Sequence, residues 1–569
     1  MRRYVKGAET AMNENLNYIQ LKTSNCKNCY KCIRHCAVKS IKFSGNQAHI
    51  LPNECILCGT CYVVCPQNAK QIRNDVRTVK TAIADGKKVI ASLAPSFVAN
   101  YGVGIKAMSN ALKKLGFDSA EETSVGAEIV KKEYENILRS GETDVLISSC
   151  CHTVNTLIQK YYPDQLPKLA RVLSPMQAHC AYIKEHDPDA YTVFIGPCIS
   201  KKEEADKYRE HVDTVLTYGE LSDWLKEEGV SLEPCEDDKS VNKSALFPTS
   251  GGILRSMNRD DIDYSFLVID GLENCQRALE DIRSGEIKHC FIEMSACAGS
   301  CINGPVMEET KPIMNYLSVD KYAGKGDCLE NQPEKEKLAK SFAVESGFKD
   351  YPGEAQIKEI LVKMGKTTPE HELNCGSCGY TTCREKAVAV YQGKADFTMC
   401  LPYLKDKAES FSDNIINNTP NGILVLNEDF EVQLINKAAC RMMKIKNQAD
   451  VLGCPVIRIL NPSEYMNVYA NNQNVYEKKT FLAEYQLYVE ETIIYDANYH
   501  IIMSIMRDIT DEENRRTKKE NTNMQAVEIT DKVIDKQMRV VQEIASLLGE
   551  TTAETKIALT KLKETLADE

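Results

Sequence analysis

The sequence predicts a multidomain protein of the α/β class, and three observations support this prediction. The chain has 569 residues, a length typical of about three to five domains. Most of its 24 cysteines fall in short, regularly spaced runs before residue 401. From about residue 411 these runs stop, and alternating apolar residues are followed by a helical repeat. The chain therefore divides into an N-terminal metal-binding part and a C-terminal part of different character.

Composition and charge exclude several classes of function. With 43% hydrophobic and 27% charged residues the chain is ordinary globular material, and its net charge of -11 favours neither nucleic acid nor an anionic membrane as a partner. The first ten residues lack the apolar core of a signal peptide, and no run approaches the roughly 20 apolar residues that span a bilayer. We therefore expect a cytoplasmic protein with no membrane partner. In so long a chain, tight Cys-x-x-Cys runs indicate metal binding and not disulfides.

The first run of cysteines is an internal duplication within residues 1–80. Two segments share one spacing, in which three cysteines at intervals of three are followed by a fourth: Cys26, Cys29, Cys32, Cys36 and Cys55, Cys58, Cys61, Cys65. Three thiolates on one tight loop suit three irons of a cubane, and the fourth iron is reached from the other half of the fold. Zinc is the alternative, although four-cysteine zinc sites normally pair two Cys-x-x-Cys knuckles.

This duplication resembles a bacterial two-cluster ferredoxin, in which the fourth cysteine of each run ligates the other cluster. The resemblance implies two [4Fe-4S] clusters with crossed ligand sets. Cluster one would be held by Cys26, Cys29, Cys32 and Cys65. Cluster two would be held by Cys55, Cys58, Cys61 and Cys36. One departure is Ala37, which stands where the second run has Pro66.

Five cysteines in three distant segments form the second pattern. They are Cys150 and Cys151 in Ser-Ser-Cys-Cys-His, Cys198 in Gly-Pro-Cys-Ile-Ser-Lys, and Cys297 and Cys301 in Ser-Ala-Cys-Ala-Gly-Ser-Cys. Thiolates gathered in this way are soft ligands suited to iron and sulfide. The alternative is a set of unrelated core thiols, but structural cysteines need no such spacing.

These segments resemble the [FeFe]-hydrogenases, whose three cysteine-bearing loops hold the H-cluster. Further matches follow in the family's order: Ala94-Pro95-Ser96 after an apolar strand-like run, Ser250-Gly251-Gly252-Ile253, and Gly271-Leu272-Glu273-Asn274 opening a helix-like stretch. The resemblance covers about residues 81 to 330 and implies an α/β H-cluster domain over residues 81–360.

The resemblance also implies roles for single residues. Cys151, Cys198 and Cys297 would ligate a cubane, and Cys301 would complete it and bridge to a two-iron subsite. Lys201 matches the position whose ammonium hydrogen-bonds an iron cyanide, with Glu204 next in the polar surround. Cys150 matches the proton donor, since nearby charge can tune a thiol pKa toward neutral. A solvated Lys201 and a buried bystander Cys150 are the alternatives.

The lining of this site departs from the metabolic enzymes while all four ligands remain. His152-Thr153-Val154 follows the double cysteine, and Gly196 and Ser295 stand where the family has methionines. Ala298 replaces a proline, and the glycine-rich tail after the last ligand is shortened. This pattern resembles the sensory branch of the family. His152 is interpreted as a core histidine, with a proton shuttle or a gate as alternatives.

A third module is predicted over residues 361–410, after a charged stretch expected to be helical over about 331–365. Its cysteines are Cys375, Cys378, Cys383 and Cys400, the last two separated by a helix-length gap. The pattern resembles the small four-iron domain of corrinoid iron-sulfur proteins and of the Rnf-complex B subunit, which implies one additional [4Fe-4S] cluster in a small helical domain. Zinc is the alternative. Seven unassigned cysteines are expected to be small buried apolar side chains: Cys180, Cys235, Cys275, Cys290, Cys328, Cys440 and Cys454.

Residues 411–512 have the pattern of an α+β domain. Two alternating strands surround an Asn-Glu-Asp turn over residues 421–436, a short helix is expected over 437–443, and strands are expected around 481–488 and 492–506. This order, with the closing phrase Met506-Arg507-Asp508-Ile509-Thr510, resembles a PAS domain. No ligand is indicated, and Cys440 is interpreted as a core residue.

Residues 513–569 carry apolar residues at alternating steps of four and three, which predicts a coiled-coil helix and pairing of two chains. The seam residues are Ile534, Met538, Val541, Ala545, Leu548, Thr552, Thr555, Leu559, Leu562 and Leu566. Gly549 is a weak point of about 1 kcal/mol relative to alanine. No histidine follows His500, so we expect any output to act through a signalling partner in trans.

The favoured hypothesis is a sensory [FeFe]-hydrogenase that binds or slowly oxidises H2, or senses redox state, and relays electrons through the accessory clusters to the PAS module. Its expected partners are H2 and protons, a ferredoxin-like redox protein and a second copy of the chain. One alternative is a metabolic, ferredoxin-linked hydrogenase with a regulatory tail. Another is a non-catalytic iron-sulfur sensor or scaffold that holds only a cubane.

Overall fold

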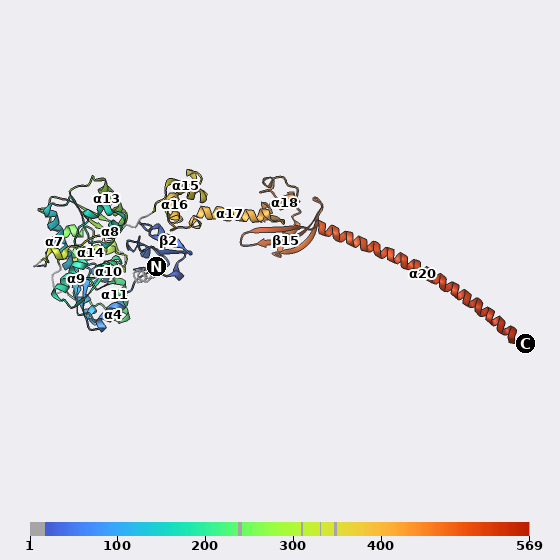
Figure 1. The fold of residues 1–569 in the computed structure, drawn as a ribbon, viewed down its shortest axis with the longest axis horizontal. Coiled ribbons are helices and arrows are strands. Elements are labelled where there is room, and N and C mark those ends of the chain that lie inside the picture. The colour runs from blue at the N-terminus through green and yellow to red at the C-terminus, as the bar shows by residue number, and fades with distance from the viewer. Residues whose placement is uncertain (1–17, 237–241, 309–310, 330–331, 346–349, 568–569) are drawn as a thin grey trace, which may run out of the picture. The chain divides into compact units, whose positions relative to one another are not determined.

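The structure is a computed structural model that describes residues 18–236, 242–308, 311–329, 332–345 and 350–567 (Figure 1). It divides into two compact units, Met1–Leu404 and Lys405–Glu569. Within the described residues, no helix is both long and apolar enough to cross a membrane.

The N-terminal module is built from short elements around two antiparallel strand pairs, β1 with β4 and β2 with β3. Ile33, Ile41 and Ile56 are almost fully buried and form its core. Each cysteine run leads into one short helix. The elements are β1 (Ile19–Leu21), α2 (Lys31–Arg34), β2 (Ile41–Ser44), β3 (Gln47–Ile50), α3 (Thr60–Val63) and β4 (Lys70–Ile72).

The next domain contains two parallel sheets, one of four strands in the order β6-β5-β8-β9 and one of three in the order β10-β11-β7. β7, β8 and β11 are almost entirely buried, as expected for parallel strands covered on both faces. The strands are β5 (Lys88–Leu93), β6 (Ser119–Glu122), β7 (Val145–Ile147), β8 (Ala190–Gly196), β9 (Thr214–Thr217), β10 (Ser265–Asp270) and β11 (Cys290–Ser295). This arrangement confirms the predicted α/β domain.

Helices connect and cover these strands (Figure 1). The expected strand before Ala94 is β5, and the helix-like stretch after Gly271 is α13. The helices are α4 (Val76–Ala84), α5 (Phe97–Tyr101), α6 (Ile105–Lys114), α7 (Ser124–Ser140), α8 (His152–Tyr161), α9 (Pro175–His186), α10 (Ser200–Lys207), α11 (Tyr218–Glu227), α12 (Gly252–Ser256), α13 (Leu272–Ser284) and α14 (Pro312–Tyr322).

The third module contains α15 (Glu354–Lys363), α16 (Cys383–Tyr391) and the start of α17 (Leu401–Asn418). Two helix predictions were too long here. In the described part of residues 331–365 only a turn at Lys335–Leu338 and α15 are helical, because Pro333 and Pro352 interrupt the stretch. The helix-length gap between Cys383 and Cys400 is helical only as far as Tyr391, where α16 ends before Gly393 with a φ of +66°.

The second unit folds as a five-stranded antiparallel sheet in the order β13-β12-β16-β15-β14. β12 alternates buried and half-buried residues, as a sheet with one covered face requires. The strand expected over 492–506 is instead two strands joined by a turn at residues 497–500, where Asp496 and Asn498 favour a reversal. The elements are β12 (Gly422–Asn427), β13 (Val432–Ile435), α18 (Lys437–Met442), α19 (Ser463–Asn471), β14 (Val475–Leu482), β15 (Leu487–Asp496) and β16 (Ile501–Asp508).

The predicted C-terminal helix is a single continuous element, α20 (Thr510–Ala567). Five seam residues are 52–61% exposed on this single chain: Ile534, Met538, Val541, Leu548 and Leu559. The helix is therefore confirmed, whereas its pairing into a coiled coil stays a prediction.

Candidate metal centre

The cysteines of the central domain lie where parallel strands end. Cys150 and Cys151 follow β7, Cys198 follows β8, and Cys297 follows β11. The carboxyl ends of parallel strands are the common place for ligand sites in open α/β sheets, because the strands present their following loops to one edge. The fold thus brings segments more than 140 residues apart in the sequence to one place.

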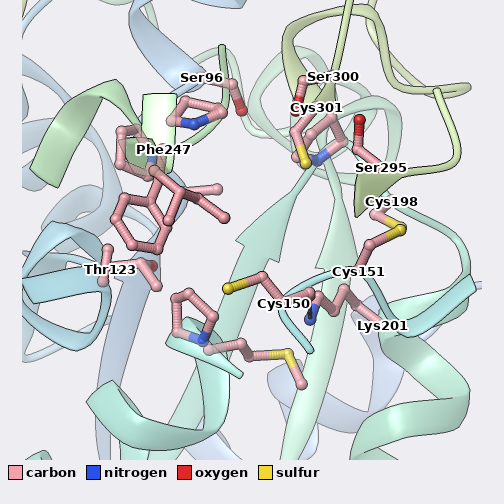
Figure 2. A pocket seen from close by; sticks show the side chains of 18 of the residues that line it. Ser96, Thr123, Cys150, Cys151, Cys198, Lys201, Phe247, Ser295, Ser300 and Cys301 are labelled. Carbon is pink, nitrogen blue, oxygen red and sulfur yellow. Dashed lines mark hydrogen bonds between the residues drawn. The ribbon is translucent and has the colours of Figure 1, made fainter. Parts of the chain in front are cut away.

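A cavity of about 100 Å³ opens at this edge (Figure 2). Its walls are mostly apolar and include Phe194, Phe247, Ile253 and Met294. The predicted site residues that face it are Cys150, Cys151, Cys198, Lys201 and Cys301. Cys297 instead lines a larger cleft of about 700 Å³, which it shares with Cys36 and Cys58.

All four predicted cubane ligands lie close enough to affect one another. Burial raises the pKa of Cys297 well above its usual value, and negative charge on Cys198, Cys301 and Cys151 would raise it further. Cys301 has accessible surface because it lines the cavity, yet burial still raises its pKa to about 12. The structure therefore gathers the four thiols that the spacing singled out.

The loop from Cys297 to Cys301 is tightly folded, as its small residues predicted. Gly299 has a φ of +77°, which favours glycine, and a Cβ there would collide with Nδ2 of Asn303. Asn303 Nδ2 also donates a hydrogen bond of 3.0 Å to the Ala298 carbonyl. The positive φ therefore favours glycine at this turn, and a larger residue would also displace the Asn303 side chain.

The donor set fits an iron-sulfur cluster. Only thiols stand at the four predicted ligand positions, and thiolates are the usual protein ligands of iron in such clusters. Within the described residues, no three His, Cys, Asp or Glu side chains converge as they would around one metal ion.

Lys201 lies at the cavity wall, on the first turn of α10. Its Nζ donates hydrogen bonds to the Cys150 carbonyl at 3.1 Å and to Glu204 at 2.5 Å. Burial alone would lower the pKa of Lys201, but the Glu204 carboxylate outweighs it and raises the pKa. The residue is only 9% exposed, so Lys201 is not a solvated surface lysine.

Glu204 lies behind Lys201 and does not line the cavity. This fully buried carboxylate accepts hydrogen bonds from Lys201, from Lys340 at 2.5 Å and from Ser174 at 3.1 Å. Burial would raise the pKa of Glu204, but the two ammonium groups hold it well below its usual range. Its contact with the site therefore passes through Lys201.

Cys150 points away from the sulfur of Cys198 (Figure 2). Burial raises the pKa of its thiol to about 12, although the Tyr134 hydroxyl at 3.3 Å and the Lys201 charge oppose this rise. Burial and nearby charge thus act on the pKa of Cys150 in opposite directions. Tyr134 is a contact that the sequence pattern did not indicate.

Glu293 is a second cavity residue that sequence reasoning missed. It lies on β11, is 3% exposed, and accepts a hydrogen bond of 3.0 Å from the Leu254 amide. Burial raises the pKa of Glu293 to about 7. A lone acid inside the apolar stretch Cys290–Ser295 was the available signal.

His152 was interpreted as a core histidine, and it is indeed buried, but it lies among charges. Its Nε2 is 3.1 Å from Glu203, and its Nδ1 is 3.8 Å from Glu204. His152 thus extends the network that begins at Lys201.

The N-terminal cysteines are grouped largely as predicted. Cys36, Cys55, Cys58 and Cys61 lie near one another, and so do Cys26, Cys29 and Cys32. The fourth cysteine of each run has similar surroundings. Cys36 Sγ accepts a hydrogen bond from the Ser40 amide at 3.4 Å, and Cys65 Sγ accepts one from the Ala69 amide at 3.3 Å. The duplication in sequence is therefore also a duplication in structure.

The third module gathers Cys375, Cys378, Cys383 and Cys400 around one small cavity of about 20 Å³. Lys386 is also there, and burial lowers its pKa to about 8. Among the unassigned cysteines, Cys180, Cys275, Cys290 and Cys440 are buried as expected. The expectation was wrong for Cys235, Cys328 and Cys454, which lie in irregular surface segments.

Models of known families match four segments of the chain. Residues 87–305 match the iron only hydrogenase large subunit, C-terminal domain, residues 48–71 a 4Fe-4S binding domain, residues 372–402 an Fe-S cluster domain and residues 411–475 a PAS domain. The chain therefore contains an iron-only hydrogenase large-subunit domain, a 4Fe-4S binding domain and a PAS domain.

Individual relatives are distant. Iron hydrogenase 1 from Clostridium pasteurianum is 27% identical over 369 residues, which span 52% of this chain and 64% of that protein. Cytosolic iron-sulfur assembly component 3 from Bos taurus is 25% identical over 341 residues, which span 45% of this chain and 71% of that protein. A solved apo [FeFe]-hydrogenase from Chlamydomonas reinhardtii is 17% identical, with a TM-score of 0.41 over 48% of this chain and 100% of its own.

Proposed function

We propose that this protein is a sensory [FeFe]-hydrogenase that binds or slowly oxidises H2, or responds to redox state, at an H-cluster. In this proposal two ferredoxin-type [4Fe-4S] clusters and one additional [4Fe-4S] cluster carry electrons. The PAS module passes the signal to a partner in trans. The observation that carries it is one cavity lined by three predicted cubane ligands together with Cys150 and Lys201, in a chain that also contains a PAS domain.

The residues have distinct parts in this proposal. Cys151, Cys198, Cys297 and Cys301 would hold the H-cluster, which when bound supplies the iron site where H2 is split into, or formed from, protons and electrons. Lys201 Nζ would donate hydrogen bonds into the cavity, and Cys150 Sγ would hold a proton at its wall. Apolar neighbours such as Phe247 and Met294 would exclude water.

Infrared spectroscopy of the protein matured with the two-iron subsite tests this function. Carbon monoxide and cyanide bands that shift between argon and H2 are the expected result, with Cys301→Ala as the control that loses them. Absence of these bands in the matured wild-type protein would contradict the proposal.

A cubane-only iron-sulfur sensor or scaffold is the second candidate, and the similarity to cytosolic iron-sulfur assembly component 3 favours it. Iron and sulfide in the wild-type protein without infrared bands would support this candidate. A metabolic hydrogenase would instead show bands together with rapid H2 turnover with ferredoxin.

A further inference from the structure

Two glycines, each next to a predicted cluster ligand, bring separate modules into close backbone contact. Gly59 directly follows Cys58 and has a φ of +76°. A Cβ there would lie 2.5 Å from Cβ of Pro305 and 3.0 Å from Cδ1 of Ile199. Ile199 directly follows a predicted cubane ligand, and Pro305 lies four residues after Cys301. The ferredoxin-type module therefore contacts the loops of the central site through the backbone beside Cys58.

The second glycine joins the third module to the ferredoxin-type module. Gly379 directly follows Cys378 and has a φ of +90°. A Cβ there would lie 3.1 Å from Cγ2 of Ile33 and 3.3 Å from the backbone nitrogen of Arg34. Lys39 Nζ donates to the Gly379 carbonyl at 3.3 Å, and Arg34 donates to two other carbonyls of the cysteine loop, both at 3.4 Å. Basic side chains thus hold this loop against the ferredoxin-type module.

The contacts of the second junction favour cluster two over cluster one. Lys394 of the third module pairs at 2.6 Å with Glu54, which directly precedes Cys55. Cys36 and Cys58 also line one cleft together with Cys297. Cys36 and Cys58 both belong to the ligand set predicted for cluster two, which therefore lies at both junctions.

We propose that cluster two, held by Cys36, Cys55, Cys58 and Cys61, is the central link between the third cluster and the cubane, and that cluster one is a side branch. Each transfer moves one electron from a reduced cluster to an oxidised neighbour, with no bond made or broken. Electron tunnelling weakens steeply with distance, so backbone contact beside a ligand on each side gives the shortest route. This inference rests on the iron-sulfur part of the proposed function.

Electron paramagnetic resonance of the full-length, dithionite-reduced protein tests this order, because nearby reduced clusters broaden each other's signals. The protein is prepared without the two-iron subsite, so the result does not depend on H2 chemistry. Removing cluster two with Cys36→Ser and Cys61→Ser should narrow the signal of the third cluster. Removing cluster one with Cys26→Ser and Cys29→Ser should leave the signal of the third cluster broadened. The reverse pattern, or no broadening in the wild type, would overturn the proposal.

A milder pair of variants avoids the loss of a cluster. Gly379→Ala should weaken the broadening, because a Cβ pushes the loop away from Ile33, while iron content stays at the wild-type level. Gly393→Ala is the matched control, since Gly393 has a similar φ of +66° and nothing within 4 Å. Equal broadening in both variants would contradict the role of this contact. Iron missing from the third site in the wild type would also overturn the inference, whereas missing infrared bands would affect only the H2 function.

Discussion

At the scale of single residues, Glu204 is the most constrained charge near the site. Its carboxylate is 0% exposed and balances both Lys201 and Lys340. Removing one member of a buried charge cluster leaves the others without compensation, which costs about 3–5 kcal/mol. We therefore expect Glu204→Gln to lower the free energy of unfolding by about that amount in urea denaturation.

An exposed ion pair provides the control for this change. Glu359 pairs with Lys363 on the surface of α15, and exposed pairs contribute little to stability. Glu359→Gln should leave the unfolding midpoint unchanged. Equal effects of the two substitutions would show that the charges around Glu204 are not buried in solution.

The stability of the protein should depend on pH through Glu293. Burial raises its pKa to about 7 from an ordinary 4.5. A carboxyl group with a higher pKa in the folded state binds its proton more tightly there, so stability falls as pH rises from about 4.5 to 7. Glu293→Gln cannot ionise, and its stability relative to wild type should rise across this window by up to about 3 kcal/mol, then level off.

Urea unfolding at a series of pH values measures this difference. The glutamine side chain retains an oxygen that accepts the hydrogen bond from the Leu254 amide, so this hydrogen bond is the same in the variant and the wild type. A difference between variant and wild type that does not change with pH would contradict a raised pKa.

The sequence indicated the thiols that gather at the site better than the polar groups around them. Ligand spacing is a local property of a loop, so Cys297 and Cys301 could be identified from their own segment. Lys340 reaches Glu204 across 136 residues, and Tyr134 reaches Cys150 from α7. Such contacts depend on how helices pack on the sheets, and no local pattern encodes them.

At the scale of elements, a single asparagine fixes the start of the PAS sheet. Asn436 is fully buried at the N-terminus of α18. Its Oδ1 accepts hydrogen bonds from the amides of Ala439 and Ile423. Its Nδ2 donates hydrogen bonds to the carbonyls of Ile416 and Asn421. Loss of an N-cap costs about 1 kcal/mol, and each buried group left without a partner about 1–3 kcal/mol.

We therefore expect Asn436→Ala to destabilise the PAS unit by about 3 kcal/mol or more, which hydrogen exchange of β12 would detect. Asn447 caps only a short exposed turn, so Asn447→Ala should cost no more than about 1 kcal/mol. Unchanged protection of β12 in Asn436→Ala would contradict this role.

Element types were predictable where the apolar period was regular. The alternation in β12 and the apolar run of β5 follow directly from one or two covered faces. Helix lengths were less predictable, because the ends depend on turns such as that at Gly393. The charged stretch before α15 has helical composition, but its prolines and its contacts with α8 prevent a continuous helix. One such contact is the hydrogen bond from the Glu345 amide to the Gln159 carbonyl.

At the scale of the whole molecule, the apolar seam of α20 is the feature that most needs a partner. Val541, Leu548 and Leu559 are 55–61% exposed on the single chain, although apolar residues at alternating steps of three and four normally pack against another helix. A second copy of the chain would cover the same seam by symmetry.

Lysine substitutions in the seam test this pairing. Met538→Lys with Leu548→Lys would bury unpaired charge in a coiled coil, so we expect the Kd for self-association to rise by at least about 100-fold, a cost of about 3 kcal/mol. Ser546→Lys with Thr560→Lys adds the same charge outside the seam and should leave a dimer. Analytical ultracentrifugation of the full chain measures both. A dimer that survives the seam substitutions would mean that surfaces other than α20 hold the two copies together, and a wild-type monomer would contradict the coiled coil.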